Sequence, residues 1–122
     1  MEKLKGTFEA LMTMAKEWGI YVIIRPMPGP LQGKVKGTYV HNDDGRPLEE
    51  LIWLEEALTL EELVPVLAHE LGHYQHRLRY GELYSRDSYL YNWAYDRGAV
   101  AWLEDAADEL GRELLSQVME VA

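Results

Sequence analysis

Residues 59–78 read TLEELVPVLAHELGHYQHRL and carry the strongest structural signal in the chain. Thr59 followed three residues later by Glu62 is typical of a helix N-terminus, where the two side chains bind backbone N–H groups that have no partner inside the helix. Pro65 allows a local bend or a later start. The stretch predicts an amphipathic helix whose apolar face comprises Leu60, Leu63, Val64, Leu67, Leu71, Tyr74 and Leu78.

Two histidines lie away from the apolar face of this helix. At about 100° per residue, His69 and His73 fall about 180° and 220° from Leu60, one turn apart. Two imidazoles at this spacing can bind one metal ion, whereas the alternative is a pair of solvated histidines. Since the chain has no cysteine, its metal ligands must come from His, Asp and Glu. The pattern predicts a metal site at His69 and His73.

Glu70 lies beside the predicted metal, about 100° around the helix from His69. A carboxylate there can take a proton from a water that the metal activates, because zinc lowers the pKa of its water from about 15.7 to about 7. The same carboxylate can then give the proton to the leaving amine of a peptide bond. The predicted reaction is therefore amide hydrolysis, with Glu70 as the general base.

A catalytic zinc site needs a third protein ligand. A further helical pattern runs from about residue 89 to residue 110, and a carboxylate on its buried stripe would need a partner. We therefore predict Asp96 as the third ligand, with Glu82 or a salt bridge from Asp96 to a nearby arginine as alternatives. Glu104, rotated about 80° from Asp96, is predicted to lie on the solvated side. The stripe comprises Asp96, Ala99, Leu103, Ala106 and Leu110.

Other polar residues lie near the predicted site, but none of them is predicted to be a metal ligand. His76 follows His69 by seven residues and is expected to be exposed, as is His41 unless it is structural. Several tyrosines lie between the two helices that carry the predicted ligands. A phenol there can donate a hydrogen bond to an oxyanion, which makes Tyr91 or Tyr95 a candidate for that role.

The remaining sequence predicts one small α+β domain over residues 1–122. An amphipathic helical pattern ends at Gly19, and three β-branched or aromatic runs follow. The helix that starts near residue 89 is expected to end near Gly111, with a short helix over residues 112–121. Because the strands come before the later helices, we expect a small, mainly antiparallel sheet. The predicted strands are Ile20–Arg25, Val35–His41 and Leu51–Leu54.

Charge and composition exclude several kinds of function. Residues 1–40 hold six Lys or Arg against three Asp or Glu, while residues 41–122 hold six against eighteen, for a net charge of −9. Direct binding to nucleic acid needs clustered Lys and Arg, so an acidic body argues against it. Charged residues interrupt the first nineteen positions, and no apolar run reaches membrane-spanning length. We expect a cytoplasmic protein that does not contact a membrane.

These features together resemble the ImmA/IrrE family of metallopeptidases. The resemblance covers the leading helix, the GIYVI run at 19–23, the GTY run at 37–39, the LIW run at 51–53 and HELGHY at 69–74. In that family a glutamate is the third ligand and is followed by Ala three residues later and an aromatic residue six later. Asp96, Ala99 and Trp102 match this pattern, with Asp in place of Glu.

The resemblance implies a zincin-like fold, one zinc ion per chain and limited proteolysis of a transcriptional repressor or other regulator. The substrate would bind as an extended strand along the edge of the sheet. Because Asp96 is one methylene shorter than the family's glutamate, another class of function stays open. That alternative is a metal-stabilised binding module that captures a regulator without cutting it, and an acidic mimic of DNA is a further one.

Overall fold

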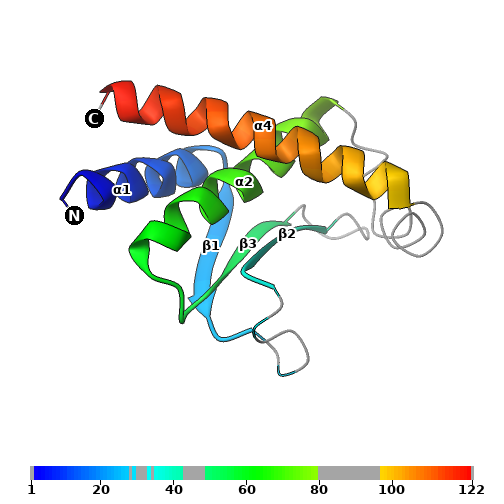
Figure 1. Cartoon of the computed structure of the whole chain (residues 1–122), viewed down its shortest axis with the longest axis horizontal. Coiled ribbons are helices and arrows are strands. Elements are labelled where there is room, and N and C mark those ends of the chain that lie inside the picture. Colours follow the sequence, from blue (N-terminus) through cyan, green and yellow to red (C-terminus); the bar gives the residue numbers. More distant parts are fainter. Residues whose placement is uncertain are drawn as a thin grey trace.

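The computed structural model of the 122-residue chain describes residues 2–27, 29, 33, 35–42, 49–79 and 97–121. These residues form an α+β fold in which the helices lie on one side of a three-stranded sheet (Figure 1). α1 (Glu2–Glu17) and α2 (Leu60–Arg79) pack on the sheet, and α4 (Arg97–Val121) packs mainly on α2. The predicted α+β class is confirmed.

The sheet is mixed, so the prediction of a mainly antiparallel sheet is wrong. Its order is β1-β3-β2, with β1 parallel and β2 antiparallel to β3. β3 lies in the centre of the sheet, and its Ile52 and Leu54 are fully buried, whereas Tyr21 of the edge strand β1 is 70% exposed. The strands are β1 (Ile20–Arg25), β2 (Gly37–Asn42) and β3 (Glu49–Glu55).

The first helix follows its apolar pattern and ends where glycine predicts. Leu11 and Ala15 of α1 are fully buried. Gly19 has a φ of 76°, a left-handed conformation that glycine adopts without steric cost. The chain reverses there, and β1 begins at Ile20.

The predicted cap of α2 is confirmed. The Glu62 carboxylate accepts hydrogen bonds from the Thr59 backbone N–H at 3.2 Å and from its hydroxyl at 3.1 Å. The Thr59 carbonyl in turn accepts from the N–H groups of Glu62 and Leu63 at 3.0 and 2.8 Å. Pro65 lies inside the helix, which runs unbroken from Leu60.

α2 is buried on more sides than the sequence predicts. Val64, Leu67 and Leu71 belong to the main core as expected. His76, expected to be exposed, is only 4% exposed, because its ring packs against Trp102 of α4 at a centroid distance of 4.9 Å. Leu78, expected on the buried face, lies in the last turn and is 62% exposed.

α4 continues through the position where the sequence predicts its end. Gly111 is buried within a single helix, so the separate helix over residues 112–121 does not exist. The buried stripe is turned by about 60° relative to the predicted one. The start expected near residue 89 lies outside the described residues. The stripe comprises Leu103, Ala107, Gly111, Leu114 and Val118.

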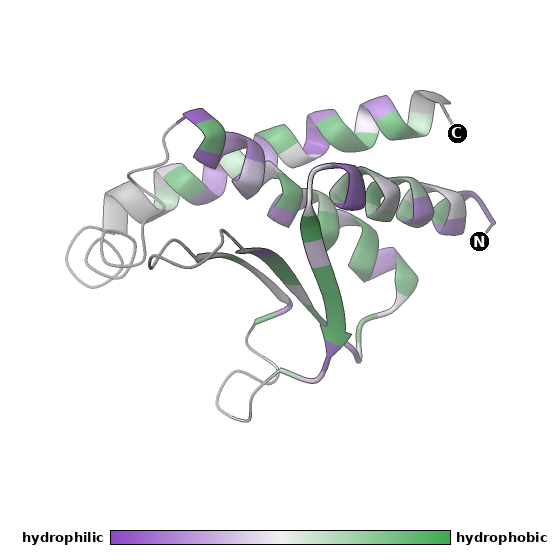
Figure 2. Cartoon of the chain, turned by 180° about the vertical axis from the view of Figure 1, so that it is seen from behind, coloured by the Kyte–Doolittle hydropathy of each residue, from purple (hydrophilic) through white to green (hydrophobic). Residues whose placement is uncertain are grey.

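The core lies between the sheet and the helices. In Figure 2, β1 is hydrophobic along most of its length, while the helices alternate between hydrophobic and hydrophilic residues. No helix in the described part of the chain combines the length and apolar character needed to cross a membrane. The core comprises Leu11, Ala15, Ile20, Ile52, Leu54, Val64, Leu67, Ala68, Leu71, Leu114 and Val118.

Candidate metal centre

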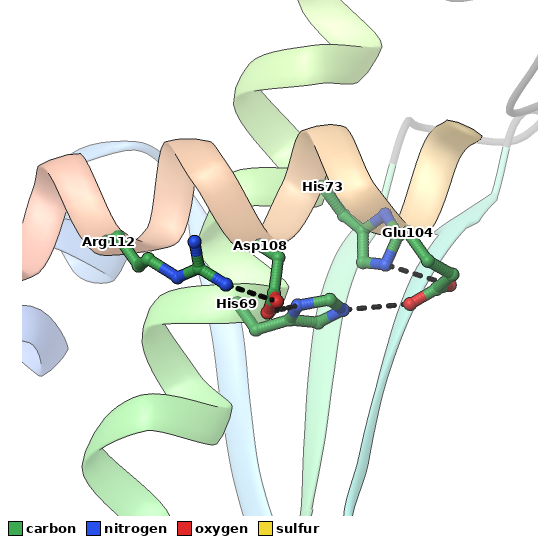
Figure 3. A network of polar contacts seen from close by, with 5 residues as sticks. All are labelled: His69, His73, Glu104, Asp108 and Arg112. Carbon is green, nitrogen blue, oxygen red and sulfur yellow. Dashed lines mark hydrogen bonds and ion pairs between the residues drawn. The ribbon is translucent and has the colours of Figure 1, made fainter. Parts of the chain in front are cut away.

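His69 and His73 of α2 and Glu104 of α4 converge on one point (Figure 3). One ligand atom from each lies within 4.8 Å of the others. The Glu104 carboxylate reaches both rings, with Oε2 at 2.9 Å from His69 Nε2 and Oε1 at 3.2 Å from His73 Nε2. These three side chains can hold a metal ion.

A second carboxylate fixes the orientation of the His69 ring. Asp108 Oδ1 lies 3.0 Å from His69 Nδ1, and Arg112 donates to Asp108 Oδ2 at 3.1 Å. Histidines that bind metals commonly donate their other ring N–H to a carboxylate, which sets the tautomer and the ring orientation. Asp108 therefore holds His69 with Nε2 directed at the point where the three ligand atoms meet, as Figure 3 shows.

The charges of His69, His73 and Glu104 strongly affect one another. The hydrogen bond that the His69 ring donates to the Glu104 carboxylate raises the pKa of His69 to about 9, even though burial acts in the opposite direction. Burial tends to raise the pKa of Glu104, but hydrogen bonds from His69 and His73 outweigh it and hold that pKa well below its usual range. The raised pKa of His69 favours the protonated ring, so a metal ion bound at its Nε2 atom must displace that proton.

Glu70 is the most informative residue at this site, because one of its oxygens has no hydrogen-bond partner in the described part of the chain. The residue is 4% exposed, and its Oε2 has no hydrogen-bond partner among the described residues. Burial raises the pKa of Glu70 to about 7, against the charges of His73 and His69. A buried polar oxygen left without a partner is costly, so the site fits a bound group that supplies one.

The donor set fits zinc. Two imidazoles and one carboxylate are a common set of protein ligands for catalytic zinc, which keeps its fourth position for water or substrate. A buried carboxylate next to these ligands, with an oxygen free to accept a proton, has the place that a general base needs. A bound zinc ion is therefore consistent with the donor set of His69, His73 and Glu104, and with the Glu70 oxygen that has no partner among the described side chains.

A buried polar network connects the sheet to α2 beside His73. The Tyr39 hydroxyl donates to the Glu50 carboxylate and accepts from Arg77 Nε at 2.7 Å. Arg77 Nη2 also lies 2.7 Å from Glu50 Oε1. The Tyr39 ring is nearly parallel to the His73 ring, at 7° and a centroid distance of 6.4 Å. β2 and β3 are thereby joined to the helix that carries the histidines.

The structure places some of the predicted site residues and leaves others undescribed. It brings His69 and His73 together, with Glu70 buried beside them. Asp96, the predicted third ligand, lies outside the described residues, as does its alternative Glu82. The same holds for Tyr91 and Tyr95 and for the side chain of His41.

Glu104 is the site residue that the sequence prediction assigned to the solvated side. Its side chain is 41% exposed, and its carboxylate contacts both histidines. With the buried stripe turned toward it, Glu104 lies at the flank of the packing face, about 60° from the centre of the stripe. Glu104 is therefore partly exposed, as that assignment expects, but it also belongs to the group that can hold a metal ion, which the assignment does not include.

A sequence signal for Glu104 does exist. Ala107 follows it by three residues, as in the pattern that suggested Asp96, although Leu110 stands where that pattern has an aromatic residue. Asp108 follows Glu104 by four residues and so lies on the same side of the helix. Glu104 and Asp108 together give His69 one carboxylate for each ring nitrogen.

Comparison of the chain with protein-family models, curated proteins and solved structures found no match. A proposal for the function of this protein therefore depends on the chemistry of the site.

Proposed function

We propose that this protein is a zinc-dependent endopeptidase with a zincin-like fold, which cleaves a protein substrate by limited proteolysis. One observation carries the proposal. A buried glutamate, Glu70, has an oxygen without a described partner, and it lies beside a group of two histidines and one carboxylate that can hold a metal ion. The resemblance of the HELGHY run at 69–74 to ImmA/IrrE metallopeptidases points to the same function.

His69, His73 and Glu104 would hold the zinc. When bound there, zinc would act as a Lewis acid that polarises a peptide carbonyl and makes a water molecule acidic. Asp108 keeps the His69 ring in place through its Nδ1 atom. The three ligands come from two helices, so the relative position of α2 and α4 sets the geometry of the site.

Glu70 would act as the general base and then as the general acid. Its carboxylate is buried, and burial raises its pKa to about 7, so it can take and release a proton near neutral pH. A cation nearby would favour the ionised form, which is the form that accepts a proton. We assign this transfer to Oε2, the oxygen that has no partner within the described ranges.

The outer edge of β2 is the place for an extended substrate. The Glu55 N–H donates to the Lys36 carbonyl at 2.9 Å, so this pair bonds across the two strands. In an antiparallel pair, every second residue bonds to the partner strand, and the residues between them direct their N–H and C=O groups away from it. Since Lys36 bonds to β3, Gly37 and Tyr39 direct these groups toward the outer edge of β2. Since the Tyr39 ring lies parallel to that of His73, a strand added to this edge would pass beside the metal centre.

The resemblance suggests a transcriptional repressor or another regulator as the substrate. A Glu70→Gln variant tests the function, since it would keep the ligands and remove the base. Loaded with zinc, it is used as bait to capture intact substrate, and the captured protein is then incubated with wild type. We expect zinc-dependent fragments by mass spectrometry, and cleavage by Glu70→Gln slower by about 10² to 10⁴.

A matched variant controls for the loss of charge. Glu109→Gln changes an exposed carboxylate on α4 and should cleave at the wild-type rate. The competing function is a binding module that captures a regulator without cutting it. Equal neutralisation of the partner by wild type and Glu70→Gln, with the partner left intact, would falsify the peptidase proposal and support the binding module.

A further inference from the structure

Two glycines let the backbones of α2 and α4 touch. A Cβ atom added to Gly72 would lie 2.2 Å from the carbonyl oxygen of Ala107, and one added to Gly111 would lie 2.8 Å from that of Ala68. Real Cβ contacts essentially never fall below 3.0 Å. The obstructing atoms belong to helix backbones, which cannot rotate aside as side chains can. Alanine at either position would therefore force the helices apart.

This contact lies in the same helical turns as the candidate ligands. Gly72 directly precedes His73 in α2, and Ala107 follows Glu104 by three residues, almost one turn of α4. Figure 3 shows the two helices crossing next to the side chains of His69, His73 and Glu104. Any change in the helix separation at Gly72 would therefore move Glu104 relative to the histidines.

The distances indicate how sensitive the site is to such a change. Relieving the Gly72 contact from 2.2 Å to 3.0 Å requires a shift of 0.8 Å. Distances between a metal and its ligands vary by only about 0.2 Å. The Glu104 carboxylate oxygens lie 2.9 Å from His69 Nε2 and 3.2 Å from His73 Nε2. A shift of this size would move the carboxylate out of reach of at least one of the two rings.

We propose that Gly72 is a positioning residue of the metal centre, which lets α4 come close enough for Glu104 to reach both histidines. This inference rests on the proposed metal site. Replacing a glycine that is needed only for packing would lower stability and leave the metal affinity of the folded protein unchanged. Replacing a positioning glycine would also change the metal affinity and the coordination geometry, because the third ligand would move away.

The test measures zinc affinity by competition with a chelator, and coordination geometry by the absorption spectrum of bound cobalt(II). Gly72→Ala should bind zinc at least tenfold more weakly than wild type and change the cobalt spectrum. The double variant Gly72→Ala, Glu104→Ala should bind little more weakly than Glu104→Ala, because both changes remove the same ligand. Gly6→Ala is the matched control, since an added Cβ there meets nothing within 4 Å, and it should bind like wild type.

Gly111→Ala keeps the inference testable if Gly72→Ala does not fold without metal. Its added Cβ intrudes less, so we expect a folded protein with a smaller loss of zinc affinity. Wild-type affinity and an unchanged cobalt spectrum in folded Gly72→Ala, or in Gly111→Ala if the first variant does not fold, would overturn the inference. Failure of the wild-type protein to bind zinc would overturn the proposed metal site itself, and this is measured first.

Discussion

Glu104 shares one carboxylate between two imidazoles, which makes it the residue on which the third metal bond depends. Its two oxygens face His69 and His73 separately, and its pKa is held low by the hydrogen bonds that these rings donate. A carboxylate that stays ionised next to two nitrogen donors is ready to bind a divalent cation. At the scale of single residues, metal affinity should therefore depend on Glu104 as well as on the histidines.

The first prediction is that Glu104→Ala weakens zinc binding at least tenfold, because the change removes one of three protein ligands. Competition with a chelator of known affinity measures it. Asp105→Ala is the matched control, since it removes an exposed carboxylate from the next position of α4 and should leave the affinity unchanged. If Asp96→Ala lost the metal and Glu104→Ala kept it, the ligand role would belong to the residue that the sequence first suggested.

The residues of the site differ in how far the sequence alone could identify them. His69, Glu70 and His73 lie within five positions of one helix, so their relative placement follows from helical geometry. Glu104 lies 35 positions after His69, and its orientation depends on which side of α4 is buried. The prediction placed the buried stripe about 60° away because it treated Gly111 as the end of a helix and not as part of the packing face.

At the scale of elements, α2 carries both histidines and depends on a well-formed N-terminus. Thr59 and Glu62 bind each other's backbone and side-chain groups there. These contacts hold the pKa of Glu62 below its ordinary value, and the hydrogen bond from the Thr59 backbone N–H is the largest cause. The ionised form of Glu62 is therefore the one that caps the helix. Its contribution to the stability of the fold is fully present above the ordinary pKa of Glu62, and it is lost as the pH falls through the lowered pKa of the folded protein.

The second prediction is that Thr59→Ala lowers the free energy of unfolding by about 1 kcal/mol, the usual cost of losing an N-cap side chain. Urea denaturation followed by circular dichroism measures it. Thr13→Ala is the matched control, because Thr13 lies on the exposed side of α1 with its hydroxyl on the Glu9 carbonyl. Alanine is the better helix former, so this control should be no less stable than wild type. A Thr59→Ala protein as stable as the control would contradict the prediction.

The sequence predicts the elements that have strong local signals, but it does not predict how the strands pair in the sheet. The bounds of β1 and the cap of α2 follow from short-range chemistry, namely β-branched residues closed by prolines and a Thr-to-Glu spacing of three. The pairing of β1 with β3 has no such local signal, because the burial of Ile52 and Leu54 is decided by the helices packed above them. The mixed sheet could therefore not be inferred from the order of the strands.

At the scale of the whole molecule, the core and the metal centre are built from partly separate contacts. The core joins α1, the sheet and one face of α2, and the end of α4 adds Leu114 and Val118. The candidate ligands lie outside this core, on another side of α2 and at the flank of the packing face of α4. The metal-free protein should therefore stay folded, unlike small zinc domains that need the metal to fold. Zinc should add stability by holding the two helices together.

The last prediction concerns the size of that added stability. With free zinc at about 100 times its dissociation constant, binding to the folded state alone adds about 2.7 kcal/mol, which for a chain of this size raises the melting temperature by roughly 10 °C. Differential scanning calorimetry with zinc and with a chelator measures the shift. Magnesium at the same concentration should change little, because it prefers oxygen ligands to imidazoles.

The ligand variants decide whether the shift comes from this site. In His73→Ala, one imidazole and the Glu104 carboxylate remain, so the same free zinc should give a much smaller rise. His73 is only 5% exposed, so the variant itself should melt lower than wild type without metal, and the comparison is made between its own zinc and chelator scans. A full wild-type shift in His73→Ala would mean that zinc stabilises the fold from another place, since a site built on both helices cannot lose a ligand and keep its affinity.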